Sequence, residues 1–101
     1  MQNSQSHVWY EQLALELPEE NALGWKSFCK LHFGISILRS ENTEYKKVYD
    51  NAIKGLSYEQ KLEVMKFYPV TSIMTKAQLS AYFEAMQNHF VTRGVTLEFL
   101  R

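Results

Sequence analysis

The stretch TKAQLSAYFEAMQNHFVTRGV, residues 75–95, decides the fold class of this chain. It opens with Thr75 and Gln78, whose spacing is that of a capping box, in which each side chain bonds the other residue's backbone N–H. It closes at Gly94, a residue that readily takes the left-handed conformation that ends helices. The sequence therefore predicts a helix from Thr75 to about Arg93. The apolar residues that recur every three or four positions along it are Leu79, Tyr82, Phe83, Met86 and Phe90.

The same periodicity predicts four further helices upstream, each ended by Pro or Gly. Ser57 begins a second capping box, and Pro69 stops the helix that follows it. Asn42 is a suitable N-cap for the helix before that one. Gly34 is expected as a left-handed C-cap, and the alternating segment 35–38 after it is open to a brief extended conformation. The predicted helices cover about 7–17, 20–33, 42–55, 57–68 and 75–93.

Helices with short connections pack as antiparallel neighbours around one core. A chain of 101 residues has room for one such core. We therefore expect an all-α fold, a compact bundle of about five helices. Residues 1–6 are expected to form a disordered polar tail, and residues 7–101 a single helical domain. Completion of the core by dimerisation is left open, because small chains often bury apolar surface across a two-fold axis.

The formal net charge is zero, but the charges are distributed unevenly. Residues 1–22 carry four acidic side chains and no basic one, whereas residues 23–40 carry Lys26, Lys30 and Arg39 and no acid. A local basic surface is therefore expected on a neutral protein. The N-terminus is not that of a secretory signal, and no apolar run is long enough to cross a bilayer, so a cytoplasmic protein with no membrane role is expected.

Catalytic motifs are weak in this sequence. Cys29 and His32 share a helical face, which suits a nucleophile and its base, but Trp25 and Phe28 lie on the same face and favour core packing. The lone cysteine excludes a cysteine-based zinc framework, and the scattered glycines form no phosphate loop. We expect no enzyme activity, no catalytic residue, no metal site and no cofactor.

The segment WKSFCKLHF, residues 25–33, has the character of a binding surface. Lys26 and Lys30 are neighbours on the side of this helix away from Trp25 and Phe28. Basic residues with aromatic neighbours can follow a phosphate backbone and stack on bases. The alternative is an ordinary amphipathic helix with a solvated lysine face. The residues predicted to contact DNA are Lys26, Lys30, Arg39, Lys46 and Lys47.

Two stretches carry a family resemblance. GWKSF at residues 24–28 resembles the Trp-Lys-x-x-Phe segment of the Orf/NinB family of lambdoid phage recombination mediators, with one residue fewer between Lys26 and Phe28. VTSIMT at residues 70–75, with RGV at residues 93–95, resembles a second segment of that family. The family's β-rich N-terminal portion has no counterpart here, and a helical run replaces its Gly-rich strand. The resemblance implies a dimeric accessory protein of phage recombination that binds single-stranded DNA and engages the host single-strand-binding protein.

The sequence therefore leaves two functions open. The first is a small phage or mobile-element accessory protein that is not catalytic and binds single-stranded DNA, recombination or replication proteins, or both. The second is a helical protein–protein interaction or regulatory module with no nucleic-acid role. This second function requires exposed apolar residues, and the candidates that fall off the helical stripes are Leu15, Ile37, Phe67 and Phe99.

Overall fold

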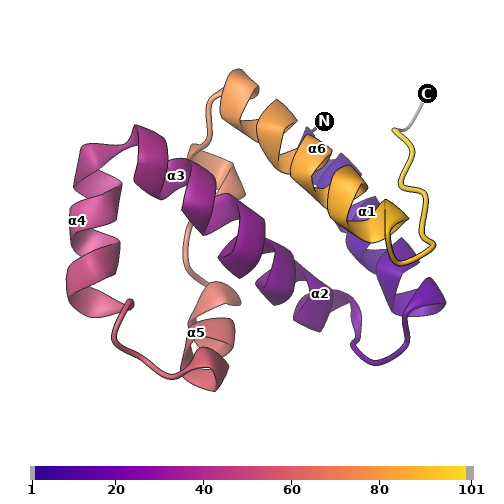
Figure 1. Cartoon of the computed structure of the whole chain (residues 1–101), viewed down its shortest axis with the longest axis horizontal. Helices are drawn as coiled ribbons and strands as arrows, with labels where there is room; N and C mark the ends of the chain where they lie inside the picture. Colours follow the sequence, from indigo (N-terminus) through magenta and orange to yellow (C-terminus); the bar gives the residue numbers. More distant parts are fainter. Residues whose placement is uncertain (1, 100–101) are drawn as a thin grey trace.

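The computed structural model describes residues 2–99, with side chains from residue 5 onward, and these residues form helices joined by loops and turns (Figure 1). No strand occurs in this range, which confirms the predicted all-α class. The elements are α1 (Gln2–Glu16), α2 (Ala22–Cys29), a π-helical turn (Lys30–Gly34), α3 (Ile35–Glu41), α4 (Thr43–Ala52), α5 (Tyr58–Met65), a 3₁₀ turn (Thr71–Ile73) and α6 (Lys76–Val91).

Both predicted capping boxes are present. In α6 the Gln78 backbone N–H donates to Thr75 Oγ1 at 3.1 Å, and the Thr75 N–H donates to Gln78 Oε1 at 2.9 Å. Ser57 and Gln60 exchange the same two bonds at the start of α5, at 3.0 and 3.1 Å. These bonds satisfy backbone donors that would otherwise lack partners in the first helical turn, so both helices start where predicted.

The C-terminal end of α6 also follows the prediction. Gly94 has φ +83°, the left-handed conformation that favours glycine. The Val95 N–H donates to the Phe90 carbonyl at 3.0 Å, and the Gly94 N–H donates to the Val91 carbonyl at 3.1 Å. These two bonds define a Schellman motif, and the buried Val95 side chain supplies its hydrophobic contact.

The helix predicted to stop at Gly34 does not stop there. Gly34 has φ −67°, and α2, the π turn and α3 form one uninterrupted helix from Ala22 to Glu41. A Cβ at Gly34 would lie 2.4 Å from Val70 Cγ1, so this glycine permits close packing and is no cap. The C-cap prediction was wrong, because a tertiary contact decides the role of this glycine. The segment 35–38, for which a brief extended conformation was open, is helical.

This long helix crosses the molecule with α1 and α6 on one side and α4 and α5 on the other (Figure 1). A π turn inserts an extra residue and rotates the following helical face by about 100°. Trp25 and Cys29 therefore pack into a cluster with α1 and α6, whereas Ile35 and Leu38 pack into a second cluster with α4 and α5. Met74 contacts both clusters and joins them.

The N-terminus departs from the predicted polar tail. Helix α1 begins at Gln2, and the side chains of Gln5 and Ser6 are buried, so the expectation for residues 1–6 was wrong over residues 2–6. Met1 lies outside the described residues. Trp9 and Tyr10 anchor the next turn in the core, and a helix extends from an anchored turn at little free-energy cost.

Candidate anion-binding site

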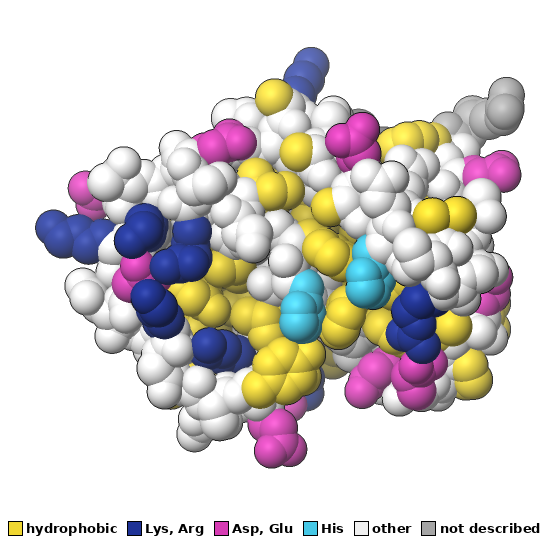
Figure 2. Space-filling view, in the orientation of Figure 1, with side chains coloured by type: hydrophobic (Ala, Val, Ile, Leu, Met, Phe, Trp, Pro, Cys, Tyr) yellow, Lys and Arg dark blue, Asp and Glu magenta, His cyan; other side chains and the backbone are white. Residues whose placement is uncertain are grey.

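The structure separates the five residues predicted to contact DNA. Lys26 and Lys30 lie on the α2 side of the long helix, whereas Arg39, Lys46 and Lys47 lie at its far end and on the neighbouring α4. Figure 2 shows basic side chains gathered on the side of the molecule formed by α3 and α4. The five residues therefore form two regions and not one continuous surface.

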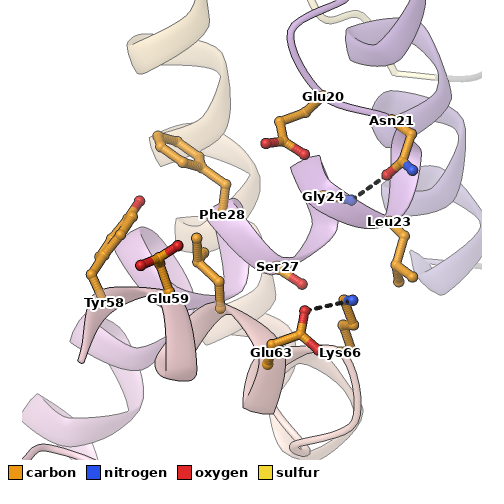
Figure 3. A pocket seen from close by; sticks show the side chains of 11 residues that line it. Glu20, Asn21, Leu23, Gly24, Ser27, Phe28, Tyr58, Glu59, Glu63 and Lys66 are labelled. Atoms are coloured by element: carbon orange, nitrogen blue, oxygen red, sulfur yellow. Dashed lines mark hydrogen bonds and ion pairs between the residues drawn. The ribbon is translucent and has the colours of Figure 1, made fainter. Parts of the chain in front are cut away.

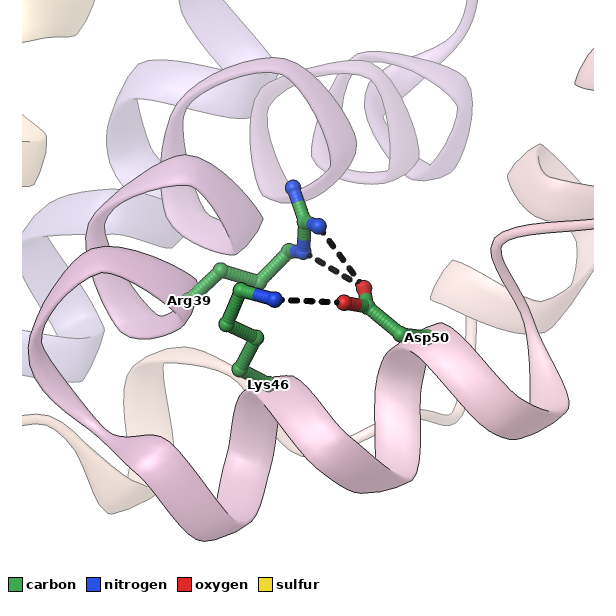
Figure 4. Close-up of polar contacts among 3 residues, drawn as sticks. All are labelled: Arg39, Lys46 and Asp50. Atoms are coloured by element: carbon green, nitrogen blue, oxygen red, sulfur yellow. Dashed lines mark hydrogen bonds and ion pairs between the residues drawn. The ribbon is translucent and has the colours of Figure 1, made fainter.

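In the α3–α4 region, an acidic side chain already engages the bases. Arg39 Nε and Nη2 donate to Asp50 Oδ1 at 2.9 and 2.8 Å, and Lys46 Nζ donates to Asp50 Oδ2 at 2.9 Å (Figure 4). The Lys46 hydrogen bond, together with Arg39, lowers the pKa of the Asp50 carboxyl. The Arg39 guanidinium also lies 5.7 Å from the centre of the Tyr49 ring. Lys47 is exposed. The charges of α3 and α4 sum to zero, because Glu41, Glu44 and Asp50 balance the three bases, and two of these bases are already paired.

The second basic region is a cavity of about 300 Å³ between the first half of α1, the start of the π turn, and the segment that follows α5. Three lysines line it, namely Lys26, Lys30 and Lys66, and no described residue of its wall is acidic. Five residues with hydroxyl side chains also line it, namely Ser6, Tyr10, Tyr68, Thr71 and Ser72. The Tyr10 hydroxyl is already bonded to that of Tyr82 at 2.7 Å. We call this cavity the basic pocket. Ammonium groups and hydroxyl donors without a carboxylate form the donor set that an anion requires.

Lys30 is the least usual residue of the basic pocket. The residue as a whole is only 5% exposed, and no carboxylate among residues 5–99 pairs with it. Burial removes the ammonium from water and Lys26 repels it, so the pKa of Lys30 falls to about 8. A buried charge without a counterion is costly, and such groups are concentrated at functional sites. At neutral pH Lys30 is therefore a charged group that an incoming anion would stabilise.

An exposed aromatic side chain lies at the mouth of the basic pocket. Phe67 lines the cavity, yet 88% of its surface is in contact with solvent. The preceding residue, Lys66, donates to Glu63 Oε1 at 2.7 Å outside the basic pocket. An anion in the pocket could thus recruit Lys66 from a half-exposed ion pair of small stability. Lysine side chains and an exposed aromatic ring thus line the same cavity.

The arrangement of Cys29 and His32 does not suit nucleophilic catalysis. Cys29 is fully buried, and burial raises the pKa of its thiol, which keeps it protonated. His32 is exposed, stacks on the Phe28 ring at 4.3 Å between centroids, and shares a 2.8 Å hydrogen bond with the Tyr58 hydroxyl. The two side chains thus face different surroundings. No group of three metal-ligating side chains gathers within the described part of the chain.

Sequence reasoning identified Lys26 and Lys30 but missed their pocket partners Lys66 and Phe67. The sequence marks Phe67 only as an apolar residue off its helical stripe. Nothing in the sequence indicates that Lys66 lines the same cavity as Lys30, because this depends on how α5 packs against the long helix. One usable hint was the Lys66-Phe67-Tyr68 triplet, a base beside aromatics at a helix end.

No family model, curated protein or solved structure matches this chain. The resemblance to the Orf/NinB family therefore stays a prediction. No helix within residues 2–99 has the length and apolar character needed to cross a membrane.

Proposed function

We propose that this protein binds single-stranded nucleic acid without catalysis, with a backbone phosphate in the basic pocket and a base stacked on Phe67. The supporting observation is the pocket itself, where Lys26, Lys30 and Lys66 converge with no carboxylate among the described lining residues. A phosphate oxygen would meet the ammonium groups of Lys26 and Lys30, which have no ion pair with a described residue, whereas Lys66 would first have to leave Glu63. Binding would also relieve the uncompensated charge of Lys30.

The aromatic rim supports a single strand over a duplex. A base in a duplex is stacked on its neighbours and cannot lie flat on a protein side chain. Phe67 is almost fully exposed, so its ring is accessible to an unstacked base. Such stacking contributes about 1–3 kcal/mol per base and tolerates any base. The protein is therefore expected to prefer single strands with little sequence selectivity.

Such an activity would suit an accessory protein of phage or mobile-element recombination or replication, as the Orf/NinB resemblance implies. The α3–α4 bases form a separate region at the far end of the long helix, and Asp50 already engages Arg39 and Lys46. Lys47 remains the freest of these predicted contacts. In this proposal the α3–α4 region steers the strand, and the basic pocket holds it.

The test is a fluorescence anisotropy titration of labelled oligo(dT) at two salt concentrations. Binding should weaken steeply with salt, because each neutralised phosphate releases bound counterions. An equal length of duplex DNA should bind more weakly. Absence of oligo(dT) binding at low salt would contradict the proposal, and so would equal affinities of the wild type and Lys30→Met.

A protein-interaction module is the second candidate, favoured by apolar exposure. Leu15 and Phe67 are 85% and 88% exposed, and Phe99 is also exposed, whereas Ile37 is half-buried against the core. Sedimentation velocity over a range of concentrations tests whether the partner is a second copy. A wild-type dimer that Leu15→Ser converts to a monomer would support this function. Monomers in both cases would count against self-association.

A further inference from the structure

A second cavity, of about 510 Å³, lies between α2 and α5 (Figure 3). Its charged lining residues are Glu20, Glu59, Glu63 and Lys66, so its net formal charge is −2. We call this cavity the acidic pocket. We propose that the acidic pocket binds an alkylguanidinium group, the group carried by an arginine side chain, between its glutamate carboxylates and the rings of Phe28 and Tyr58. This site is separate from the proposed nucleic-acid function and has the opposite charge preference.

The carboxylates of the acidic pocket are only partly neutralised. Lys66 pairs with Glu63 at 2.7 Å, whereas Glu20 and Glu59 have no ion pair with any described residue. The Glu20 carboxylate lies against Gly24, where a Cβ would clash with Glu20 Oε1. The glycine leaves the space that this carboxylate occupies. Two negative groups therefore border the cavity without a cation between them.

A buried hydroxyl inside the acidic pocket gives independent support. Ser27 lines the cavity, its residue is only 2% exposed, and its Oγ has no hydrogen-bond partner. Figure 3 shows this hydroxyl turned toward the side of the pocket where Glu63 and Lys66 lie. Native proteins rarely leave a buried hydroxyl without a partner, and such a group points to an interaction that a ligand completes. A guanidinium N–H is a suitable donor to Ser27 Oγ.

The aromatic residues explain the choice of guanidinium over ammonium. Phe28 and Tyr58 both line the cavity, and Tyr58 is half-exposed. A guanidinium is planar, so it can stack on a ring while its five N–H donors reach separate oxygens. An ammonium is a compact, strongly hydrated charge with three donors and gains less from such a site. Leu23 and Leu62 supply apolar surface for the alkyl stem.

The binding test compares three small ligands with the same stem by two-dimensional ¹⁵N NMR of the whole chain. Butylguanidinium should saturate shifts of the Gly24, Ser27 and Tyr58 amides, with a Kd on the order of 1 mM. Butylurea is its neutral planar counterpart and should cause no saturable shift. Butylammonium should bind about threefold to tenfold more weakly. Absence of saturation by butylguanidinium, or equal binding of any two of the ligands, would overturn the proposal.

A pair of substitutions at equivalent helix positions tests whether the ligand binds in the acidic pocket. Glu59→Gln should weaken butylguanidinium binding by about threefold to tenfold, because it removes one partly exposed carboxylate. Glu44→Gln is the control, since Glu44 holds the same first-turn position in α4 and lies outside the cavity. Ser27→Ala should weaken binding by about twofold to fivefold and yet raise the melting temperature, because an unsatisfied hydroxyl is lost. Equal effects of Glu59→Gln and Glu44→Gln would overturn the assignment.

A blocked arginine, N-acetylarginine N-methylamide, tests whether the guanidinium belongs to a protein arginine or to a free small compound. Tighter binding than butylguanidinium would support an arginine of a partner protein, and weaker binding would support a free small guanidinium compound. Failure of both to bind would overturn the site. Oligo(dT) binding by Glu59→Gln is measured in parallel. A failure of the guanidinium proposal can then be distinguished from a failure of the proposed nucleic-acid function.

Discussion

The two basic regions of this molecule contain similar side chains, but they differ in where the nearest acid lies. Asp50 accepts bonds from both Arg39 and Lys46 in the α3–α4 region, whereas the basic pocket around Lys30 has no described acid in its wall. Two of the three predicted cations in the α3–α4 region already have a carboxylate partner. In the basic pocket, Lys26 and Lys30 have no ion pair with a described residue. Counting bases along a sequence therefore says less about binding than the position of their counterions.

Lys66 adds a further contrast, because it lines both the basic and the acidic pocket. In the structure it pairs with Glu63, which lines the acidic pocket but not the basic one. Two cavities of opposite charge preference thus lie on either side of a single ammonium.

Lys30→Met should produce the largest change. It removes the buried, unpaired ammonium and should lower oligo(dT) affinity about 10- to 100-fold, with a smaller salt dependence. Anisotropy titrations at two salt concentrations measure both effects. Lys47→Met is the control, because Lys47 is an exposed lysine outside the basic pocket, and it should change affinity less than about threefold. Equal losses in both variants would show that the two regions do not differ.

Phe67→Ala should lower oligo(dT) affinity about fivefold to tenfold, because one base loses its stacking partner. Leu15→Ala is a close match, since Leu15 is almost as exposed as Phe67 but lies on α1 outside the basic pocket. Leu15→Ala should leave the affinity unchanged. Both titrations use the same anisotropy assay, and a similar loss with Leu15→Ala would indicate a general apolar effect.

Lys30→Met should also stabilise the free protein, by about 1–3 kcal/mol at pH 7, because a desolvated charge is replaced by an apolar side chain. The pKa of Lys30 is about 8 in the folded state and higher in the unfolded chain, so the unfolded state binds more protons between these values. The stability penalty of Lys30 is therefore complete below pH 8 and diminishes as pH rises toward 10. Urea unfolding of the wild type and of Lys30→Met between pH 8 and pH 10 should show that the difference in their unfolding free energies becomes smaller as pH rises. A difference that stays constant would contradict a buried charge at Lys30.

Asp50→Asn should have the smallest effect on binding and in the opposite direction. It removes the counterion of Arg39 and Lys46, so oligo(dT) affinity should rise about twofold to fivefold with a steeper salt dependence. The pKa of Asp50 is lowered in the folded state, so its stabilising pairs persist above the unfolded pKa and are lost as pH falls through the folded value. Unchanged affinity in Asp50→Asn would place the α3–α4 region away from the strand.

Local features of this chain were predictable because their interactions span only a few residues. The Thr75 and Ser57 capping boxes join residues three positions apart, and the Gly94 motif joins residues within a single turn. Lys26 and Lys30 could be paired for the same reason. Their partner Lys66 could not, since it reaches the basic pocket from another helix.

The sequence by itself determined an all-helical chain and the two ends of α6, because hydrophobic periodicity and capping act within one helix. Only the tertiary structure decided the role of Gly34, which admits Val70 into a packed contact within one long helix. It also decided which cations are neutralised, because Arg39 and Asp50 lie on different helices. Charge pairing and close packing depend on distance in space, and that distance is set only when the helices pack.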